Sequence, residues 1–457
     1  MISPVIFRAY DIRGKAYEQL TPDACRLIGQ AFGNTLAEMY GIEHPSVVVG
    51  RDARTHGPEL EAAVTDGLIA AGCRVLLMGR TPSPLNYFTI CAKKLDGGVQ
   101  VTASHNPKED NGLKLQLRDA HAYSGDDLQS LRKRIESGSV MARPGGTTET
   151  IDAVEPYLAF IGKTFADAGR GKTVMVDGGN GVTGPVYCEG LRRAGCEVIE
   201  LYTEPDGNFP NHPADPSKHE TLKELQTMVT EKKADIGFGF DGDGDRVGVV
   251  DENGKIRTAD EILLLLARDH LSRHPGAPVI FTVSNSGILQ TEIEMWGGRP
   301  VMCKVGHSFV EHAMREHGAM LGGEQSGHFF CGEGYYGFDD ALVVALRFLN
   351  ALGGKHASDV MSDFPLVYQS PERRPHCSDD AKTDVIRKIT EYFSKTHPVI
   401  TLDGVRIDFG DGAWAGVRQS NTSPCLSICL EARSPEKLKE IEQIVLSHLK
   451  TYTDIRL

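Results

Sequence analysis

Three aspartates alternate with glycines near the middle of the sequence, in Asp241-Gly-Asp-Gly-Asp-Arg246. In extended backbone, alternate side chains point to the same side, so Asp241, Asp243 and Asp245 could meet one cation. Three carboxylates this close repel one another unless a cation balances them. Carboxylate oxygens are hard ligands, which favours Mg²⁺ or Ca²⁺. A solvated acidic turn is the simpler alternative, and the repulsion argues against it.

A calcium-binding EF-hand loop is another interpretation of the same aspartates. Counted from Asp241, position 12 is Glu252, as that loop requires, but position 6 is Arg246 where its turn needs glycine. The flanking segments 236–240 and 247–250 are typical of strands, whereas an EF-hand has helices there. The sequence therefore favours a metal site that leaves coordination positions open, which suits a metal that also holds a phosphoryl oxygen.

A serine that could carry a phosphoryl group lies in Thr102-Ala-Ser-His-Asn-Pro107, directly after a strand predicted over 98–101. A serine hydroxyl near a divalent metal can accept and donate a phosphoryl group. His105 follows Ser104, and Lys114 ends the nearby segment Asn111-Gly-Leu-Lys114. A serine before Asn-Pro is also a common turn residue, so this segment alone does not decide between the two readings.

Two further segments carry groups that suit a sugar phosphate. Glu324, Ser326 and His328 offer a carboxylate, a hydroxyl and an imidazole that could bind neighbouring sugar hydroxyls, with a structural loop as the alternative. The segment 418–424 combines a guanidinium with hydroxyl and backbone N–H groups, which is a phosphate-binding set. Its candidate residues are Arg418, Ser420, Asn421 and Thr422.

The net charge limits what the chain could bind. With 62 acidic and 49 basic residues the formal charge is −13, which argues against the basic face of a general nucleic-acid binder. An anionic substrate would therefore need basic residues concentrated locally. Arg8 and Arg13, in Phe7–Gly14, are candidates for an anion-facing pair, with surface arginines as the alternative.

A strand–helix–strand pattern that occurs three times supplies the elements that position these segments. Apolar strands are predicted at 46–50, 173–177 and 278–283, each followed by a helical stretch and a second apolar strand. Such strands predict parallel sheets covered on both faces. Ligands sit in the loops beyond the strand ends of these sheets, so the polar segments could converge on one cleft between domains.

The C-terminal part of the chain follows a different pattern. Turn signals separate the short predicted strands, and an amphipathic helix is predicted at 434–451. The strands are predicted at 399–402, 405–409, 414–418 and 426–431. The proline-rich segment 365–375 is predicted to link this part to the rest.

The fold class predicted is therefore α/β, with three related α/β domains of mixed, mainly parallel sheets and a C-terminal α+β domain around a central cleft. In chain order the domains would carry the Ser104 loop, the aspartate loop, the Glu324–His328 loop and the Arg418 loop. The predicted boundaries are 1–150, 151–254, 255–367 and 368–457.

The sequence also indicates a cellular compartment. No apolar run approaches the roughly 18–20 residues of a membrane span, and the N-terminus lacks the layout of a signal peptide. Ten cysteines are scattered without a CxxC pair, which is typical of reduced thiols. We expect a cytoplasmic protein that does not bind a membrane.

Five segments, taken in order, resemble the α-D-phosphohexomutase superfamily, in particular its phosphomannomutase/phosphoglucomutase branch. They are FRAYDIRG (7–14), TASHNP (102–107), DGDGDR (241–246), GEQSGH (323–328) and RQSNTSP (418–424). The similarity spans nearly the whole chain. It implies four domains around a central cleft, three of them related α/β units, in agreement with the repeat.

The resemblance also implies a role for each candidate residue. Ser104 would be the phosphoserine that shuttles the phosphoryl group, and its oxygen would complete a Mg²⁺ site. The other metal ligands would be Asp241, Asp243 and Asp245. The transfer itself would involve Ser104, His105, Lys114, Arg13 and Arg246. The substrate would be bound by Arg8, Tyr10, His307, Glu324, Ser326, His328, Arg418, Ser420, Asn421 and Thr422.

The implied activity is that of an isomerase that interconverts hexose 1-phosphate and hexose 6-phosphate, with mannose and/or glucose as the sugar. The reaction would pass through phosphoserine and a hexose 1,6-bisphosphate, which also serves as activator. The expected binding partner is then a phosphorylated hexose, and we expect no binding of nucleic acid or membrane. The protein would be a monomer or a homodimer. Three alternatives remain: a non-catalytic protein that binds metal or sugar phosphate, a phosphatase, and a phosphoglucosamine mutase. Ser284-Asn285, where a lysine is often found, and Gln325 are reminiscent of the last of these.

Overall fold

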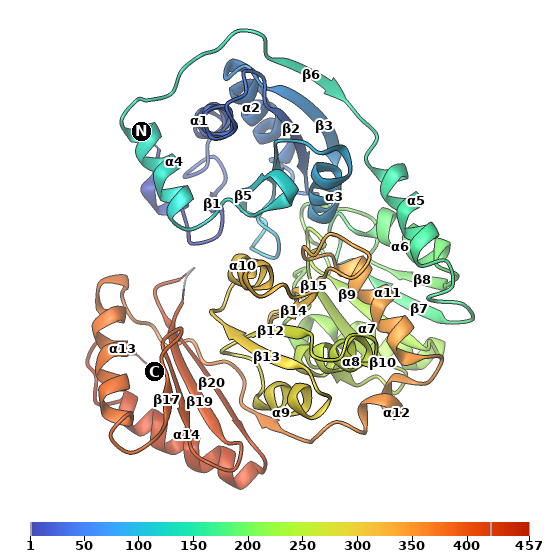
Figure 1. The fold of residues 1–457 in the computed structure, drawn as a ribbon, viewed down its shortest axis with the longest axis vertical. Helices are drawn as coiled ribbons and strands as arrows, with labels where there is room; N and C mark the ends of the chain where they lie inside the picture. Colours follow the sequence, from blue (N-terminus) through green and yellow to red (C-terminus); the bar gives the residue numbers. More distant parts are fainter. Residues whose placement is uncertain (1, 421–422, 457) are drawn as a thin grey trace. The chain divides into compact units, whose positions relative to one another are not determined.

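The computed structural model describes residues 2–420 and 423–456 (Figure 1). The chain divides into two compact units. Unit 1 comprises Met1–Ile262 and Ser326–Val360, and unit 2 comprises Leu263–Gln325 and Met361–Leu457. Each unit therefore contains two stretches of the chain. The four predicted domain boundaries are finer than this division and stay a prediction.

The first sheet of unit 1 has the strand order β1-β5-β4-β2-β3-β6. Its strands are β1 (Ile12–Lys15), β2 (Ser46–Arg51), β3 (Arg74–Arg80), β4 (Gly97–Val101), β5 (Asp110–Leu117) and β6 (Thr147–Thr150). The central strand β2 pairs in parallel with β3 and β4, and β5 runs antiparallel to β4 and β1. The β4 end therefore leads directly into the Ser104 segment.

Helices cover this first sheet. They are α1 (Pro22–Tyr40), α2 (Gly57–Ala70), α3 (Ser83–Lys93) and α4 (Asp126–Glu136), with short 3₁₀ turns η1 (Pro4–Ile6) and η2 (Arg118–Ala120). Helices α1 and α2 pack against each other, and α3 packs on β2 and β4. The buried core between them includes Phe32, Val47, Val49 and Leu68.

The second sheet of unit 1 has the order β11-β10-β9-β7-β8. Its strands are β7 (Thr173–Asp177), β8 (Glu197–Leu201), β9 (Ile236–Phe240), β10 (Val247–Asp251) and β11 (Ile256–Arg257). Strands β7, β8 and β9 are parallel, whereas β9 and β10 form an antiparallel hairpin in which Phe240 faces Val247. The aspartate segment is therefore the turn of a hairpin between two buried strands.

Helices α6 (Gly184–Arg193) and α7 (Lys223–Lys232) pack on the second sheet, and α5 (Val154–Thr164) packs on α6. Unit 1 also contains η3 (His219–Leu222), β15 (Phe329–Cys331) and α11 (Ala341–Leu352), whereas α8 (Ala259–Arg273) and α12 (Ala357–Met361) cross the boundaries between the units. Helix α11 is almost entirely apolar and packs on α6 and β10. Its first residue follows Asp340, whose carboxylate caps the helix by accepting hydrogen bonds from the N–H groups of Leu342 and Val343.

Unit 2 contains two sheets. In one, β12 (Pro278–Thr282) lies between β13 (Arg299–Cys303) and β14 (Leu321–Gly323), and both pairings are parallel. The other is antiparallel, with the order β16-β20-β19-β18-β17. Its strands are β16 (Tyr368–Gln369), β17 (Val399–Ile400), β18 (Val405–Asp408), β19 (Trp414–Gln419) and β20 (Leu426–Ala432); the helices are α9 (Gly287–Met295), α10 (His307–His317), α13 (Asp379–Phe393) and α14 (Pro435–Leu449).

One face of the antiparallel sheet of unit 2 packs on helices. Alternate residues such as Val405, Ile407 and Ile428 form a core with α13 and α14. The period of two places Arg406 and Glu431 on the other face, where both are also buried and bond backbone groups of the segment 283–287. The predicted α/β fold class is confirmed: three mixed α/β sheets and a C-terminal antiparallel sheet. The segment 365–375 was predicted to be a linker, but its strand β16 pairs with β20 and belongs to the sheet.

Two further observations concern helix hydropathy and the cysteines. Among the described residues, no helix is long and apolar enough to cross a membrane. All ten cysteines carry free thiols, and only Cys91 among them is not buried. Burial raises the pKa of the Cys25 thiol to about 12, which makes this thiol unreactive at neutral pH.

Glycine allows α1 and α2 to approach closely. A Cβ at Gly67 of α2 would overlap the backbone carbonyl oxygen of Arg26 in α1. We therefore expect Gly67→Ala to lower the free energy of unfolding by about 1–3 kcal/mol, measured by urea denaturation.

Gly162→Ala is the matched control, because a Cβ there would meet nothing closer than 3.5 Å, at Arg193. Alanine is also the better helix former, so this change should raise the free energy of unfolding by up to ~1 kcal/mol. If Gly67→Ala and Gly162→Ala change the free energy of unfolding in the same direction and by the same amount, the role assigned to the contact between α1 and α2 is contradicted.

Candidate active site

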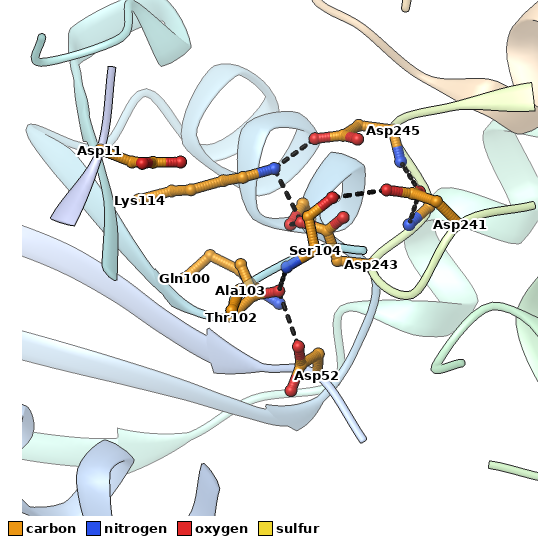
Figure 2. A network of polar contacts seen from close by, with 12 residues as sticks. Asp11, Asp52, Gln100, Thr102, Ala103, Ser104, Lys114, Asp241, Asp243 and Asp245 are labelled. Carbon is orange, nitrogen blue, oxygen red and sulfur yellow. Dashed lines mark hydrogen bonds and ion pairs between the residues drawn. The ribbon is translucent and has the colours of Figure 1, made fainter. Parts of the chain in front are cut away.

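Ser104 is held in an uncommon backbone conformation at the end of β4 (Figure 2). Its φ is 51°, in the left-handed region, and the residue is 1% exposed. Its N–H donates to the Thr102 hydroxyl at 2.8 Å, and that hydroxyl donates to Asp52 at 2.7 Å. A buried relay therefore fixes the backbone of the serine.

Arg54 is the main organiser of the Ser104 loop. The residue is 1% exposed, and its Nη atoms donate to the carbonyl oxygens of Ser104 at 2.9 Å and Asn106 at 2.6 Å. They also donate to the carbonyls of Pro107 and Asp110, and its Nε pairs with Asp52. Sequence reasoning missed this residue. The available signal was an Asp and an Arg two residues apart directly after a buried strand.

The aspartate segment turns around the side chain of its first residue. Asp241 Oδ1 accepts hydrogen bonds from the N–H groups of Gly244 at 2.9 Å, Asp245 at 3.1 Å and Arg246 at 3.2 Å. Gly244 has a φ of 87°, and its carbonyl accepts a hydrogen bond from the Tyr187 hydroxyl at 2.6 Å. The assumption of extended backbone was therefore wrong, because a tight turn gathers these side chains.

The three carboxylates nevertheless come together, as the sequence predicted. Asp241, Asp243 and Asp245 are buried, and one oxygen of each lies within 4.8 Å of the others. The Ser104 hydroxyl donates to Asp241 Oδ2 at 2.6 Å. Lys114 of β5 donates to Asp243 Oδ2 at 2.7 Å and pairs with Asp245 (Figure 2). The serine, the lysine and the carboxylates therefore form one buried cluster.

Burial and neighbouring charges shift the pKa values in this cluster in different directions. Burial and then the carboxylates of Asp245 and Asp243 raise the pKa of Asp241 well above its usual value. Burial would also raise the pKa of Asp245, but Lys114 and then His328 hold it well below that value. Burial would lower the pKa of Lys114, but the two carboxylates outweigh it and raise that pKa well above normal. The cluster therefore has more carboxylate than one ammonium can balance.

The donor set fits a hard divalent cation. Within the described residues, Asp243 Oδ1 is a buried oxygen without a hydrogen-bond partner. Oxygen atoms from three carboxylates and a serine suit Mg²⁺, and a cation at this point would supply the missing positive charge. The structure thus supports a buried acidic metal site.

His105 lies beside the serine hydroxyl. Its Nδ1 is 3.1 Å from Ser104 Oγ. Burial and then the nearby guanidinium groups of Arg246 and Arg13 hold the pKa of His105 well below its usual value, so the imidazole is neutral. Arg13 donates to Asn106 Oδ1 at 2.9 Å and to the carbonyl of Ala103, which places it at the same loop.

Two residues of the predicted sugar loop lie in unit 1. His328 Nε2 is 3.3 Å from Asp245 Oδ1 and accepts a hydrogen bond from Arg246 Nε at 3.2 Å. Ser326 Oγ is 3.0 Å from His328 Nδ1. The structure therefore brings His328 next to the carboxylate cluster. Arg8 and Tyr10 are half-buried between η1 and β1.

The other predicted binding residues lie in unit 2. Glu324 accepts a hydrogen bond from the N–H of Gly306 at 2.8 Å, directly before His307 at the start of α10. Arg418 lies at the end of β19, where its Nε is buried and without a hydrogen-bond partner among the described residues. A guanidinium N–H of this kind is suited to an anion.

A buried lysine, which the sequence reasoning missed, holds the phosphate-loop candidate. Lys382 of α13 is 3% exposed and donates to the carbonyls of Ser420 at 3.0 Å and Ser423 at 2.5 Å. Arg374 donates to the Ser420 hydroxyl at 3.0 Å. The two other predicted members, Asn421 and Thr422, lie outside the described residues.

Comparison with known proteins covers almost the whole chain. Profiles of the phosphoglucomutase/phosphomannomutase family, described as alpha/beta/alpha domains I, II and III and the C-terminal domain, match residues 4–140, 155–254, 258–368 and 374–448. The chain belongs to the phosphoglucomutase/phosphomannomutase family. The resemblance drawn from the five motifs is thereby confirmed, as is the prediction of an isomerase of this type.

Individual relatives agree with the family match. A phosphomannomutase/phosphoglucomutase of Pseudomonas aeruginosa is 41% identical over 448 residues, which cover 97% of this chain and 95% of that protein. A phosphoglucomutase of Neisseria gonorrhoeae is 37% identical, with coverage of 96% and 95%. A crystal structure of a phosphoglucomutase/phosphomannomutase family protein from Burkholderia thailandensis has a TM-score of 0.92 at 38% identity, covering 99% of this chain and 98% of that one.

Removal of the Arg54 guanidinium should destabilise the Ser104 loop. Arg54→Met leaves the Asp52 carboxylate buried without its partner and removes donors from four carbonyl groups. We expect the free energy of unfolding of unit 1 to fall by about 3–5 kcal/mol in urea denaturation.

A double variant and an exposed pair control this experiment. Asp52→Asn together with Arg54→Met should lose less stability than the sum of the two single changes, because no charge is left unpaired. Arg132→Met breaks a surface pair with Glu136 and should cost at most about 1 kcal/mol. A loss in Arg54→Met as small as that in Arg132→Met would refute the role of Arg54.

Proposed function

We propose that this enzyme interconverts hexose 1-phosphate and hexose 6-phosphate, with mannose and/or glucose as the sugar. Phosphoserine 104 would donate its phosphoryl group to the free hydroxyl of the substrate and give a hexose 1,6-bisphosphate. The other phosphoryl group of this intermediate then returns to Ser104. The bisphosphate therefore serves both as intermediate and as activator of unphosphorylated enzyme.

The observation that carries this proposal is the position of the serine hydroxyl. Ser104 Oγ lies 2.6 Å from a carboxylate oxygen and 3.1 Å from a neutral imidazole, in a cluster with a buried ammonium. Transfer of a phosphoryl group depends on positioning and on charge stabilisation. A turn serine without a chemical role would not need this set of buried charged neighbours, since burying charges is costly.

The metal site is part of the proposal. Ser104 Oγ and the carboxylates of Asp241, Asp243 and Asp245 would hold Mg²⁺. When bound, Mg²⁺ supplies positive charge to the oxygens of the transferring phosphoryl group. The buried oxygens Asp243 Oδ1 and Asp245 Oδ1, which have no hydrogen-bond partner among the described residues, are available for it.

The surrounding residues stabilise charge and transfer protons. The ammonium of Lys114 and the guanidinium groups of Arg13 and Arg246 stabilise negative charge on the phosphoryl oxygens. The neutral imidazole of His105 accepts a proton from the sugar hydroxyl as the new P–O bond forms, and it passes a proton to Ser104 Oγ as the P–O bond of the phosphoserine breaks. The reverse proton movements accompany the second transfer, so the site returns to its starting state.

A single serine serves both ends of the sugar only if the bisphosphate turns over between the two transfers. In each orientation of the bound bisphosphate, one phosphate faces Ser104 and the other must be bound by a second group of residues. We assign that second task to the loop of Arg418, Ser420, Asn421 and Thr422, with Lys382 fixing the loop. The sugar hydroxyls would be bound by Glu324, Ser326, His328 and His307, with Arg8 and Tyr10 facing the substrate.

Several finer points belong to the same proposal. Mannose and glucose phosphates are favoured as substrates because the 41% and 37% identical relatives carry the names phosphomannomutase/phosphoglucomutase and phosphoglucomutase. Ser284, Asn285 and Gln325 keep glucosamine phosphate as the second candidate. We place the enzyme in the cytoplasm as a monomer or homodimer.

A substrate panel with intact-mass analysis tests the proposal. With a trace of hexose 1,6-bisphosphate, mannose and glucose phosphates should be isomerised without net release of phosphate. The active enzyme should carry one phosphate, and Ser104→Ala should lack both this phosphate and the activity, because it removes the hydroxyl that bonds Asp241.

Ser137→Ala is the matched control, because this serine is exposed and, among the described residues, its hydroxyl bonds only Arg134 and Ser139. It should retain both the phosphate and full activity. Turnover of glucosamine phosphate alone would overturn the choice of sugar. If the Ser104→Ala variant is still phosphorylated and active, the phosphoserine mechanism is overturned.

A further inference from the structure

The first turn of α3 contacts the aspartate loop directly. Ser83 is the first residue of this helix and is 0% exposed. Its backbone N–H donates to the carbonyl oxygen of Asp243 at 2.8 Å, and its hydroxyl donates to Asp243 Oδ2 at 2.5 Å. One serine therefore binds both the backbone and the side chain of the same aspartate.

These two hydrogen bonds have different consequences. The backbone contact fixes the position of the peptide and gives a partner to an N–H group that a helix N-terminus otherwise leaves open. The side-chain contact fixes the rotation of the carboxylate. With Lys114 also bonded to Oδ2, at 2.7 Å, one oxygen of Asp243 is fully used. The other, Oδ1, is the buried oxygen that has no hydrogen-bond partner among the described residues.

We propose that Ser83 is a positioning residue for the metal site, which presents Asp243 Oδ1 to the cation by holding Oδ2. This inference rests on the proposed Mg²⁺ site. The N-terminus of α3 adds its favourable interaction with a nearby anion, and the apolar helix face keeps the contact away from water. Hydrogen bonds behind metal-bound carboxylates orient these ligands, and their loss typically weakens metal binding about 10–100-fold.

The neighbouring polar contacts do not orient a carboxylate of the proposed metal site. The carboxylate of Asp340, which caps α11, accepts hydrogen bonds from the Tyr157 hydroxyl at 2.8 Å and the Tyr335 hydroxyl at 2.7 Å, and this network serves the packing of unit 1. The hydroxyl of Tyr187 contacts the carbonyl of Gly244 and thus fixes the turn, without touching a carboxylate. Ser83 is the neutral side chain whose hydroxyl bonds directly to Asp243 in the described network.

The test measures metal affinity of the full chain in the absence of substrate, with Mn²⁺ as the probe and free Mn²⁺ determined by electron paramagnetic resonance. Ser83→Ala should raise the Kd for Mn²⁺ by about 10–100-fold, because Oδ2 loses a donor and the carboxylate is free to rotate. Ser83→Thr keeps the hydroxyl and should restore the affinity. At saturating metal, Ser83→Ala should regain its kcat, with the KM for hexose phosphate unchanged.

Thr89→Val is the matched control, because Thr89 is a buried residue of the same helix whose hydroxyl bonds the carbonyl of Leu85 at 2.7 Å and Met78 Sδ at 3.5 Å, and neither belongs to the aspartate loop. Its Kd for Mn²⁺ should equal that of the wild type. If Ser83→Ala does not fold, Ser83→Cys, with a weaker donor of similar size, should show a smaller loss in the same direction.

The outcomes separate the two levels of the argument. If the wild type does not bind Mn²⁺, or if Asp243→Asn binds Mn²⁺ as tightly as the wild type, the proposed metal site is refuted. If the wild type binds at these aspartates and Ser83→Ala binds equally well, the metal site stands and the role of Ser83 is refuted. Equal weakening in Thr89→Val would also refute it, because the effect would then belong to the helix as a whole.

Discussion

The balance of buried charge at the aspartate turn is the constraint on which the active centre depends. Three carboxylates are held within 4.8 Å of one another, and Lys114 is the ammonium that pairs with two of them. Removing such charges from water costs several kcal/mol per ion unless each finds a partner. The turn between β9 and β10 and the strand β5 are therefore held together by the chemistry of the site itself.

The same constraint explains how Ser104 is positioned. Its left-handed backbone costs on the order of 1–3 kcal/mol, and the structure holds it there with the Asp52–Thr102 relay and the guanidinium of Arg54. The hydroxyl is thereby directed at Asp241 before any substrate arrives. Such preorganisation lowers the reorganisation needed when a phosphoryl group is transferred. The strained backbone of the Ser104 loop and the buried charges of the aspartate turn thus both prepare the site for phosphoryl transfer.

Much of the fold and the centre of the site could be predicted from the sequence. Apolar strands such as 173–177 are visible in the order of residues, and β7 spans this same range. The convergence of Asp241, Asp243 and Asp245 was also predicted, but on the wrong physical basis. The prediction assumed extended backbone, whereas the positive φ of Gly244 and three hydrogen bonds to Asp241 make a turn.

The supporting residues could not be predicted, because their partners are distant in sequence. Ser83 is 160 residues from Asp243, and Arg54 is 50 residues from Ser104. A serine beside prolines and an arginine after a strand have many ordinary uses, so only the folded contacts reveal what they hold. The same is true of Lys382: the sequence shows its i,i+3 pair with Asp379, but only the fold shows that its ammonium also donates to the backbone carbonyls of Ser420 and Ser423.

We propose that one divalent cation completes the charge balance between the serine and the three aspartates. Crystals of the full chain grown with Mn²⁺ test this directly, through the anomalous scattering of the metal. We expect one strong peak bounded by the side-chain oxygens of Ser104, Asp241, Asp243 and Asp245, including Asp243 Oδ1. A fully occupied Mn²⁺ site elsewhere, with Lys114 alone between these carboxylates, would contradict it.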